Sequence, residues 1–261
     1  MAEKTSPYIL DETDNFAVVF KPPRMHSAPL PARGALLAKE PRAGDTLLDW
    51  YAAAFPLVME LCGRKKGEGG LLHRLDFETN GLVLFAKTQK ALDHFLAQQA
   101  EGRFVKEYSA ICRKTSSTNP SFPPSPLCLD GQEGFVIESF FRPFGPGRKQ
   151  VRPVVRSGKG EITKDRYRTE VTGVLGQSPL VVRFAARLSR GFRHQVRCHL
   201  AWIGYPILND PLYGTLENSH DEGAAGGFLA LRANSLSFDD PGSSKSLEYR
   251  IFPLELPTNS M

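Results

Sequence analysis

The sequence contains few cysteines, and their spacing argues against disulfide scaffolds and metal sites. The 261 residues include only four: Cys62, Cys112, Cys128 and Cys198. None form a Cys-x-x-Cys pair, and no cysteine–histidine cluster has the spacing of a zinc site. So few cysteines in so long a chain exclude a disulfide framework. We therefore expect a protein of the reducing cytoplasm that holds no metal.

Long apolar stretches are also missing. The N-terminal segment, MAEKTSPYILDETDNF, lacks the apolar core of a signal peptide. The longest apolar runs, such as Tyr51 to Phe55, stop far short of a membrane span, which takes about 20 residues. No internal repeat of solenoid length is present. From these absences we expect no signal peptide, no membrane span, no solenoid repeat and no membrane partner.

The composition is that of an ordinary soluble protein with a small excess of positive charge. Hydrophobic residues make up 41% and charged residues 23%, with a net charge of +5. A mildly basic protein often meets a polyanion, but the position of the charges decides this more than their sum. The length fits one large domain or two small ones. Because no linker stands out, we predict a single domain over residues 1–261.

Apolar patterns predict strands and helices that do not alternate in strict βαβ order. The predicted strands are residues 16–20, 81–87, 106–112, 135–141, 166–175, 180–189, 231–238 and 247–252. The predicted helices are residues 46–55, with Asp45 as N-cap, 89–99 and 193–203. Predicted loops are residues 27–44, 63–70 and 113–134. The order favours an α+β fold with a mixed, largely antiparallel sheet, flanking helices and long loops.

Two of these elements carry clear periodic patterns. Apolar residues alternate along 180–189, which is typical of a strand with one buried face, and a hairpin around Gly176 joins it to 166–175. Val196, Leu200 and Ile203 form the apolar stripe of the predicted helix 193–203.

The most informative segment is GLLHRLDFETNGLVLFAK, residues 70–87. A short apolar strand end leads into Arg74 and Asp76, and a polar turn then reverses the chain into a central strand. Asp76 is therefore predicted to lie on a loop held by two buried strands, a common position for functional groups. The local pattern alone still favours a structural role, because aspartate before a turn often bonds nearby amides.

The same segment closely resembles the central motif of the RluA-type pseudouridine synthase family, HRLDxxTSGLLLFAK. Further segments resemble the family's other motifs in the expected order: FAVVFKP (16–22), KEY (106–108), GFRHQVRCHLAWIGYPILNDPLY (191–213) and LRANSLSF (231–238). The resemblance extends from residue 16 to about residue 253. It implies a pseudouridine synthase catalytic fold that isomerises uridine in structured ribosomal or transfer RNA, without a cofactor and with the target base flipped out.

The resemblance also implies roles for individual residues. Asp76 matches the catalytic carboxylate, and Arg197 matches an arginine that offsets the burial of its charge. Tyr108 matches a tyrosine that contacts the target base, and its hydroxyl is a candidate for removing the final ring proton. The predicted substrate-binding residues are Arg74, Leu231 and Lys21. Without the resemblance, Tyr108 is typical of a core tyrosine and Arg197 of a basic helix face.

The chain departs from the family pattern at a few positions. Asn80 stands where the family has serine, Phe192 and Arg193 where it has Arg-Thr, Asn209 where it has glycine, and Arg232 where it has histidine. These changes bear on substrate choice more than on chemistry. The separate N-terminal RNA-binding domain of many members is expected to be absent, and the motif set fits a monomer.

Basic residues crowd the middle of the chain and suit contacts with RNA phosphates. They are Arg142, Arg148, Lys149, Arg152, Arg156, Lys159, Lys164, Arg166 and Arg168, followed by Arg183, Arg187 and Arg190. A solvated sheet face explains the same pattern equally well. With RNA as the partner and no DNA binding expected, the affinity should fall steeply with salt.

Two motifs of nucleotide-binding proteins that the sequence superficially resembles do not fit it. The sequence HRLD is not the kinase His-Arg-Asp loop, because a leucine intervenes and no Asp-Phe-Gly or nucleotide loop accompanies it. Residues 63–70 lack the Gly-Lys-Ser/Thr of a P-loop. The alternative that stays open is a non-catalytic RNA-binding or RNA-folding protein on the same scaffold.

Overall fold

The structure is a computed structural model that describes residues 6–29, 45–116, 119–125, 134–156, 160–176, 181–214 and 227–255. Their contacts group into two compact units. Unit 1 comprises Met1–Phe104 and Ser235–Ile251, and unit 2 comprises Val105–Asn234 and Phe252–Met261. A single domain over residues 1–261 stays a prediction. Cys128, Lys159, Leu180 and residues 30–44 of the predicted loop lie outside the described residues.

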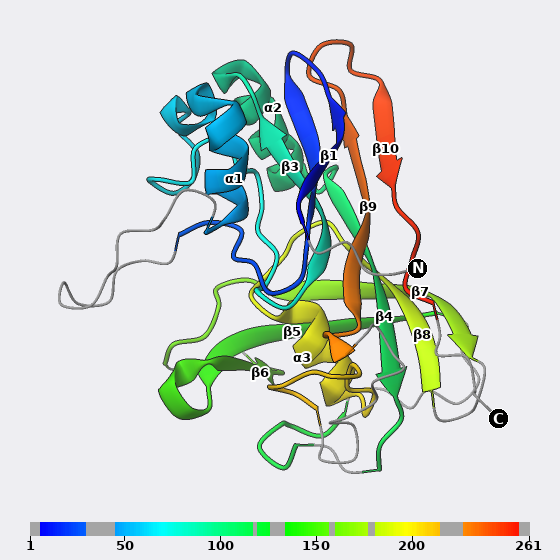
Figure 1. The fold of residues 1–261 in the computed structure, drawn as a ribbon. Helices are drawn as coiled ribbons and strands as arrows, with labels where there is room; N and C mark the ends of the chain where they lie inside the picture. The colour runs from blue at the N-terminus through cyan, green and yellow to red at the C-terminus, as the bar shows by residue number, and fades with distance from the viewer. Residues whose placement is uncertain are drawn as a thin grey trace. The chain divides into compact units, whose positions relative to one another are not determined.

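Unit 1 is built on antiparallel strands and two α-helices (Figure 1). Its strands are β1 (Tyr8–Glu12), β2 (Phe16–Lys21), β3 (Asn80–Ala86), the second part of β9 (Leu231–Asp239) and β10 (Ser246–Arg250), in the order β1-β2-β3-β9-β10. Its helices are α1 (Leu47–Ala54), the 3₁₀ turn η1 (Pro56–Glu60) and α2 (Gln89–Glu101).

The central strands of unit 1 are buried on both faces. All residues of β2 and β3 are buried, as the unbroken apolar run of β3 predicted. On one face, Phe95 of α2 packs edge-on against Phe16, with ring centroids 5.9 Å apart. On the other face, Tyr51 of α1 stacks on Phe85 at 4.5 Å. The two helices therefore cover opposite faces of the sheet.

Helix α1 begins one residue later than predicted, and its cap is Thr46 instead of Asp45. The Thr46 hydroxyl accepts a hydrogen bond from the Asp49 amide (3.2 Å), and the Asp49 carboxylate accepts one from the Thr46 amide (3.2 Å). This reciprocal capping box satisfies two amides at once, which a lone aspartate at position 45 does not do.

Unit 2 contains the remaining strands and one α-helix (Figure 1). The strands are β4 (Val105–Arg113), β5 (Phe135–Phe144), β6 (Gln150–Val154), β7 (Tyr167–Gly176), β8 (Val181–Leu188) and the first part of β9, in the order β9-β4-β8-β7-β5-β6. A 3₁₀ turn, η2 (Pro146–Arg148), lies between β5 and β6, and the helix is α3 (Gln195–Trp202).

The predicted alternation of β8 is confirmed. Phe184, Ala186 and Leu188 are buried, whereas Arg187 is exposed. The predicted antiparallel pairing of β7 with β8 is also present.

Helix α3 begins at Gln195, two residues later than predicted, and is more deeply buried than a surface helix. His194 adopts a left-handed conformation (φ 55°), which the helix cannot include, and Arg193 lies outside it. Every residue of α3 is buried, not only the predicted stripe.

A buried histidine ties α3 to the sheet. The two ring nitrogens of His199 lie 2.9 Å from the Ser139 hydroxyl on β5 and 2.8 Å from the Thr169 hydroxyl on β7. Burial lowers the pKa of His199 to about 3, so the ring is neutral at pH 7. This anchor fixes the helix that carries Arg197.

The predicted fold class is confirmed, although two strands were missed. Every strand pair with a resolved register is antiparallel. The edge strands β1 and β6 were not predicted, because β1 is largely exposed and has no apolar alternation, and Pro153 interrupts the pattern of β6. In the described part of the chain, no helix is both long and apolar enough to cross a membrane.

Candidate functional site

Asp76 lies on a loop between two hydrogen-bonded segments of unit 1, as predicted. The Leu72 amide donates to the Leu84 carbonyl (3.0 Å), and the Ala86 amide donates to the Gly70 carbonyl (2.8 Å). A Cβ atom at Gly70 would lie 2.2 Å from the Ala86 carbonyl oxygen, so only glycine permits this approach. The pairing fixes the start of the loop against β3.

A tight turn brings the chain from Asp76 into β3. The Thr79 amide donates to the Asp76 carbonyl (3.1 Å), and Gly81 has a φ of +126°, which favours glycine. Asn80, which departs from the family's serine, is completely buried at the start of β3. The Asp76 side chain itself is half-buried.

Ser27 forms the first of two clamps on this loop. Its hydroxyl donates to the Leu75 carbonyl and accepts from the Leu75 amide, both at 3.0 Å. One buried side chain therefore satisfies both backbone groups of the residue before Asp76. Sequence reasoning missed this contact, because a serine 48 positions away gives no local signal.

Lys21 forms the second clamp. Its side chain is fully buried, and Nζ donates to the carbonyls of Pro22 (2.9 Å), Met25 (2.8 Å) and Phe77 (3.3 Å). These contacts join the end of β2 to the residue that follows Asp76. The predicted role of Lys21 in substrate binding stays a prediction.

The charge of Lys21 is coupled to the two carboxylates of the loop. Burial lowers the pKa of Lys21 from 10.5 to about 7, and the negative charges of Asp76 and Glu78 partly oppose this effect. When protonated, Lys21 therefore gives Asp76 a positively charged neighbour within unit 1. Sequence analysis assigned that task to Arg197 alone.

Replacing Lys21 with methionine should destabilise the protein and change its pH dependence. Three carbonyls lose their donor, which we expect to cost about 2 kcal/mol at pH 7. The folded-state pKa of about 7 lies below the unfolded value of 10.5, so the unfolded chain binds the extra proton between them. Lys21 thus makes stability rise with pH from about 7 to 10.5, by at most about 1.4 kcal/mol per unit.

Urea unfolding at several pH values between 6 and 10 measures both effects. The free energy of unfolding should rise less steeply with pH in Lys21→Met than in the wild type. Lys90→Met, at an exposed position of α2, is the matched control and should keep the wild-type slope. Equal slopes in wild type and Lys21→Met would show that Lys21 keeps an ordinary pKa.

Two arginines flank the loop at the surface of unit 1. Arg74, predicted to bind substrate, is exposed, and its guanidinium lies 3.1 Å from the Glu68 carboxylate. Arg24 has a left-handed backbone (φ 58°) and lies 3.6 Å from the Glu78 carboxylate. Two surface ion pairs therefore accompany Asp76 on the exposed side of the loop.

In unit 2, Tyr108 lies on the sheet face that α3 covers. It pairs with Ala186, which pairs with Val171. Thr169, two residues from Val171 and on the same face, is bonded to His199 of α3. Tyr108 and Leu231, which begins β9, are both buried. Their predicted contacts with the base stay predictions.

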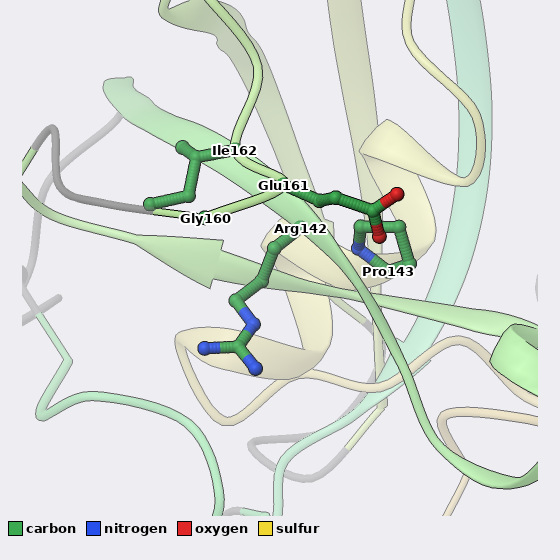
Figure 2. A pocket seen from close by; sticks show the side chains of 5 residues that line it. All are labelled: Arg142, Pro143, Gly160, Glu161 and Ile162. Atoms are coloured by element: carbon green, nitrogen blue, oxygen red, sulfur yellow. The ribbon is translucent and has the colours of Figure 1, made fainter.

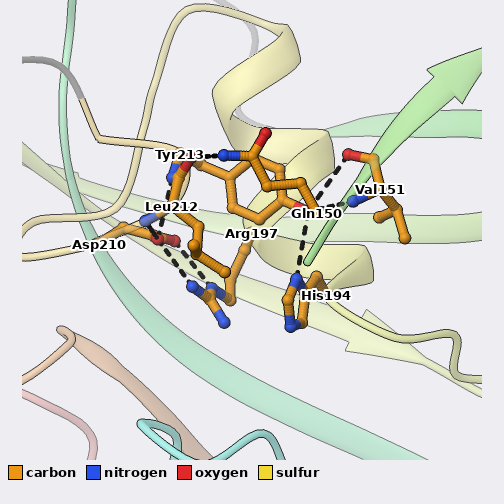
Figure 3. Close-up of polar contacts among 7 residues, drawn as sticks. All are labelled: Gln150, Val151, His194, Arg197, Asp210, Leu212 and Tyr213. Carbon is orange, nitrogen blue, oxygen red and sulfur yellow. Dashed lines mark hydrogen bonds and ion pairs between the residues drawn. The ribbon is translucent and has the colours of Figure 1, made fainter. Parts of the chain in front are cut away.

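Arg197 forms a buried, bidentate ion pair with Asp210 (Figure 3). Nε donates to Oδ2 and Nη2 to Oδ1, both at 2.8 Å, and the side chains are 3% and 0% exposed. Asp210 Oδ1 also accepts from the amides of Leu212 (2.9 Å) and Tyr213 (3.1 Å). The guanidinium is therefore held rigidly by a carboxylate in a tight turn.

Tyr213 packs beneath this pair. Its ring lies 5.5 Å from the Arg197 guanidinium carbon, and its hydroxyl bonds the amide and carbonyl of Val151 at 2.8 and 3.2 Å. His194 Nδ1 lies 3.2 Å from the same hydroxyl (Figure 3).

Arg197 is thus buried, and its observed partner is Asp210, which sequence analysis did not single out. The signal was present in the segment PILNDPLY, where aspartate precedes a turn. The predicted grouping of Asp76 with Tyr108 and Arg197 involves residues of both units and stays a prediction. Among the described residues, no group of three or more histidine, cysteine, aspartate or glutamate side chains is arranged to hold a metal ion.

Comparison with protein families settles the family. Residues 15–202, well over half of the chain, match the family model described as RNA pseudouridylate synthase. The chain belongs to this family. The family match spans Lys21, Asp76, Tyr108 and Arg197, and it confirms the resemblance found in the motifs.

Curated relatives in the pseudouridylate synthase family include ribosomal large subunit pseudouridine synthase D of Zymomonas mobilis. It is 30% identical over 209 residues, covering 77% of this chain and 58% of the relative. The protein of the same name from Haemophilus ducreyi is 27% identical over 252 residues, covering 92% and 65%. The chain thus spans between half and two thirds of the length of these relatives.

Solved structures support the pseudouridylate synthase fold. Human RNA pseudouridylate synthase domain containing 1 matches with a TM-score of 0.62 and 19% identity, covering 95% of this chain and 83% of that one. Domain containing 4 matches with a TM-score of 0.57 and 19% identity, covering 96% and 94%. At this identity the likeness establishes the fold.

Proposed function

We propose that the protein is an RNA pseudouridine synthase that isomerises uridine in structured RNA with Asp76 as its catalytic carboxylate. The observation that carries the proposal is the loop of the HRLD motif. Ser27 and Lys21 clamp the residues on either side of Asp76, while its own side chain stays half-exposed. Such rigid support is what a catalytic group needs to meet its substrate in a fixed geometry.

The reaction requires no net gain or loss of atoms. The N1–C1′ bond of uridine breaks, the base rotates, and a C5–C1′ bond forms. The proton that leaves C5 is balanced by one gained at N1. A negatively charged carboxylate serves as nucleophile or base toward the ribose, and Lys21 provides a neighbouring positive charge.

Tyr108 and Arg197 are the proposed partners of Asp76. Tyr108 suits stacking on the uracil, and its hydroxyl is proposed to help remove the C5 proton. Arg197, held by Asp210, suits a fixed positive charge near the reacting centre. Leu231 is proposed to pack on the base, and Arg74 to contact phosphate or fill the space of the flipped nucleotide.

Unmodified RNA transcripts test this function directly. We propose large-subunit ribosomal RNA as the first substrate, following the names of the relatives, and transfer RNA as the comparison. Chemical mapping of pseudouridine after incubation should give at least one discrete site. RNA binding without pseudouridine in either RNA class would favour the non-catalytic reading.

The β5–β6 hairpin of unit 2 is the proposed contact for RNA phosphates. This region is strongly basic, with eight basic and three acidic residues in 134–156 and 160–168. Its net positive charge equals the +5 of the whole chain. Arg142 and Arg152 lie directly opposite each other across the two strands. Like charges in this position destabilise a strand pair, and a bound phosphate would relieve the repulsion.

Aromatic rings accompany these arginines. Arg152 lies over Phe144 with 5.9 Å to the ring centroid, and Arg166 lies over Phe140 with 5.4 Å. Figure 2 shows Arg142 extending beside Gly160–Ile162, where a shallow hollow of about 220 Å³ is open. A face of arginines and aromatic rings suits both the phosphates and the bases of RNA.

Neutralising the arginine pair should weaken RNA binding without harming the fold. In Arg142→Gln/Arg152→Gln the slope of log affinity against log salt should become shallower by roughly 1 to 2, because up to two phosphate contacts are lost. Stability should stay equal or rise slightly, because the repulsion disappears. Fluorescence anisotropy with labelled RNA at 50–300 mM salt (roughly the range over which counterion release dominates) measures the slope.

The matched control removes two positive charges from unit 1. Lys90→Gln/Arg103→Gln takes one exposed lysine from α2 and one exposed arginine that pairs with Glu101 and Asp239. If this control lowers the salt slope as much as the hairpin variant, only net charge matters and the hairpin is no specific contact.

A further inference from the structure

Beside Asp76, unit 1 carries an aromatic pair that the proposed chemistry does not use. The rings of His26 and Phe77 lie with centroids 4.6 Å apart and planes tilted by 39°. Phe77 directly follows the catalytic carboxylate, yet its side chain is 40% exposed. The two rings therefore present a partly open aromatic surface next to the proposed catalytic carboxylate.

The pair is held in place by the two clamps of the loop. Lys21 Nζ bonds the Met25 carbonyl, next to His26, and the Phe77 carbonyl. Ser27, on the other side of His26, bonds both backbone groups of Leu75. Two buried side chains therefore join the segment that carries one ring to the segment that carries the other. The exposed rings are ordered before any ligand arrives, which lowers the entropy cost of binding.

The surroundings identify the kind of ligand. Arg24 lies two residues before His26, and the charge of Arg74 acts on the His26 ring. Each arginine pairs with a glutamate at the surface, and such exposed pairs open at little cost to contact a phosphate. Burial lowers the pKa of His26, and the charges of Lys21 and Arg74 lower it further, so its ring is neutral and can stack. A partly exposed aromatic ring with a second ring tilted beside it fits a nucleobase of single-stranded RNA, because every base offers a face for stacking.

We propose that His26 and Phe77 form a stacking surface for the base of the nucleotide next to the target uridine. The proposal rests on the proposed function, because Asp76 defines where the target lies. Phe77 directly follows Asp76, with Cα atoms about 3.8 Å apart, so the nucleotide beside the target is the one that the proposal places on the ring. The pair would thus help to select the sequence around the modified uridine.

Fluorescence of 2-aminopurine reports such stacking without turnover. The probes are single-stranded RNAs in which 2-aminopurine replaces the base on the 5′ or the 3′ side of a uridine that the wild type modifies. Binding to Asp76→Asn should quench one of the two probes. In Asp76→Asn/Phe77→Ala the quenching should disappear and the affinity should fall roughly 10-fold, whereas Asp76→Asn/Phe77→Tyr should retain both.

The matched control removes an exposed phenylalanine elsewhere. Phe252, in unit 2, is 80% exposed, and Asp76→Asn/Phe252→Ala should quench the probe as fully as Asp76→Asn does. Thermal unfolding should show that Phe77→Ala stays folded at the assay temperature, because 40% of the residue is already open to solvent. Quenching that survives in Phe77→Ala, or is absent at both probe positions, would overturn the proposal.

Turnover separates this inference from the proposed function. Phe77→Ala in an otherwise wild-type chain should modify a broader set of uridines in ribosomal RNA transcripts, or the same uridine more slowly. If the wild type makes pseudouridine and Phe77→Ala makes it at the same sites and rates, the stacking surface is refuted while the function stands. If the wild type makes none, the function itself fails.

Discussion

Pseudouridine formation is expected to fall by at least about 10³-fold when Asp76 is replaced by asparagine, with RNA binding retained. Asparagine has nearly the same shape, and the turn bond from the Thr79 amide goes to the backbone carbonyl, so the loop should keep its form. Only the negative charge and its capacity as nucleophile or base are lost. Mapping of pseudouridine and anisotropy with the same RNA measure the two properties separately.

Glu78→Gln is the control for this substitution. Glu78 lies two residues further along the same loop, and both carboxylates act on the charge of Lys21. Either amide substitution therefore perturbs Lys21 in the same direction, but only Asp76→Asn removes the proposed catalytic group. Equal losses in the two variants would mean that the carboxylates act through Lys21. Full activity of Asp76→Asn would refute the mechanism.

The second large effect is expected from the buried ion pair of unit 2. Arg197→Met or Asp210→Asn leaves a buried charge without its partner, which typically costs about 3–5 kcal/mol. Asparagine at position 210 can still accept the amide bonds of Leu212 and Tyr213, so the lost charge accounts for most of the effect. The double variant should be less destabilised than the sum of the single ones.

Tryptophan fluorescence can report the unfolding of unit 2 by itself. The chain has two tryptophans, Trp50 in α1 and Trp202 in α3, so a Trp50→Phe background leaves a signal from unit 2 alone. Urea unfolding of each variant in the Trp50→Phe background gives its free energy of unfolding. Arg168→Met, which breaks the exposed pair with Glu170, is the control and should cost no more than about 1 kcal/mol. A similarly small cost for Arg197→Met would contradict the structural role of the pair.

The same variants separate a structural from a catalytic role of Arg197. If the arginine only stabilises unit 2, Asp210→Asn and Arg197→Met should lose activity in proportion to their lost stability. If it also supplies charge to the reacting centre, Arg197→Met should be far less active than Asp210→Asn at equal stability. Rates of pseudouridine formation by Arg197→Met and Asp210→Asn are compared at a temperature at which both variants are folded.

The sequence alone determined the fold class, most of the strands and the loop that carries Asp76. These features depend on local patterns: alternation in β8, a continuous apolar run in β3, and a polar turn after HRLD. Local patterns failed at the edge strands β1 and β6, because β1 is largely exposed and has no apolar alternation, and Pro153 interrupts β6. They also misplaced the start of α1, because the competing caps at Asp45 and Thr46 differ only in their contacts with Asp49.

Only the tertiary structure decided how the candidate residues are supported. The contact of Ser27 with Leu75 and that of Lys21 with Phe77 join residues 48 and 56 positions apart, and the partner of Arg197 proved to be Asp210. The reason is physical. A residue's place in a strand or helix follows from its neighbours in sequence, but the partner of a buried charge or hydroxyl is whichever group the packed chain brings within hydrogen-bond distance.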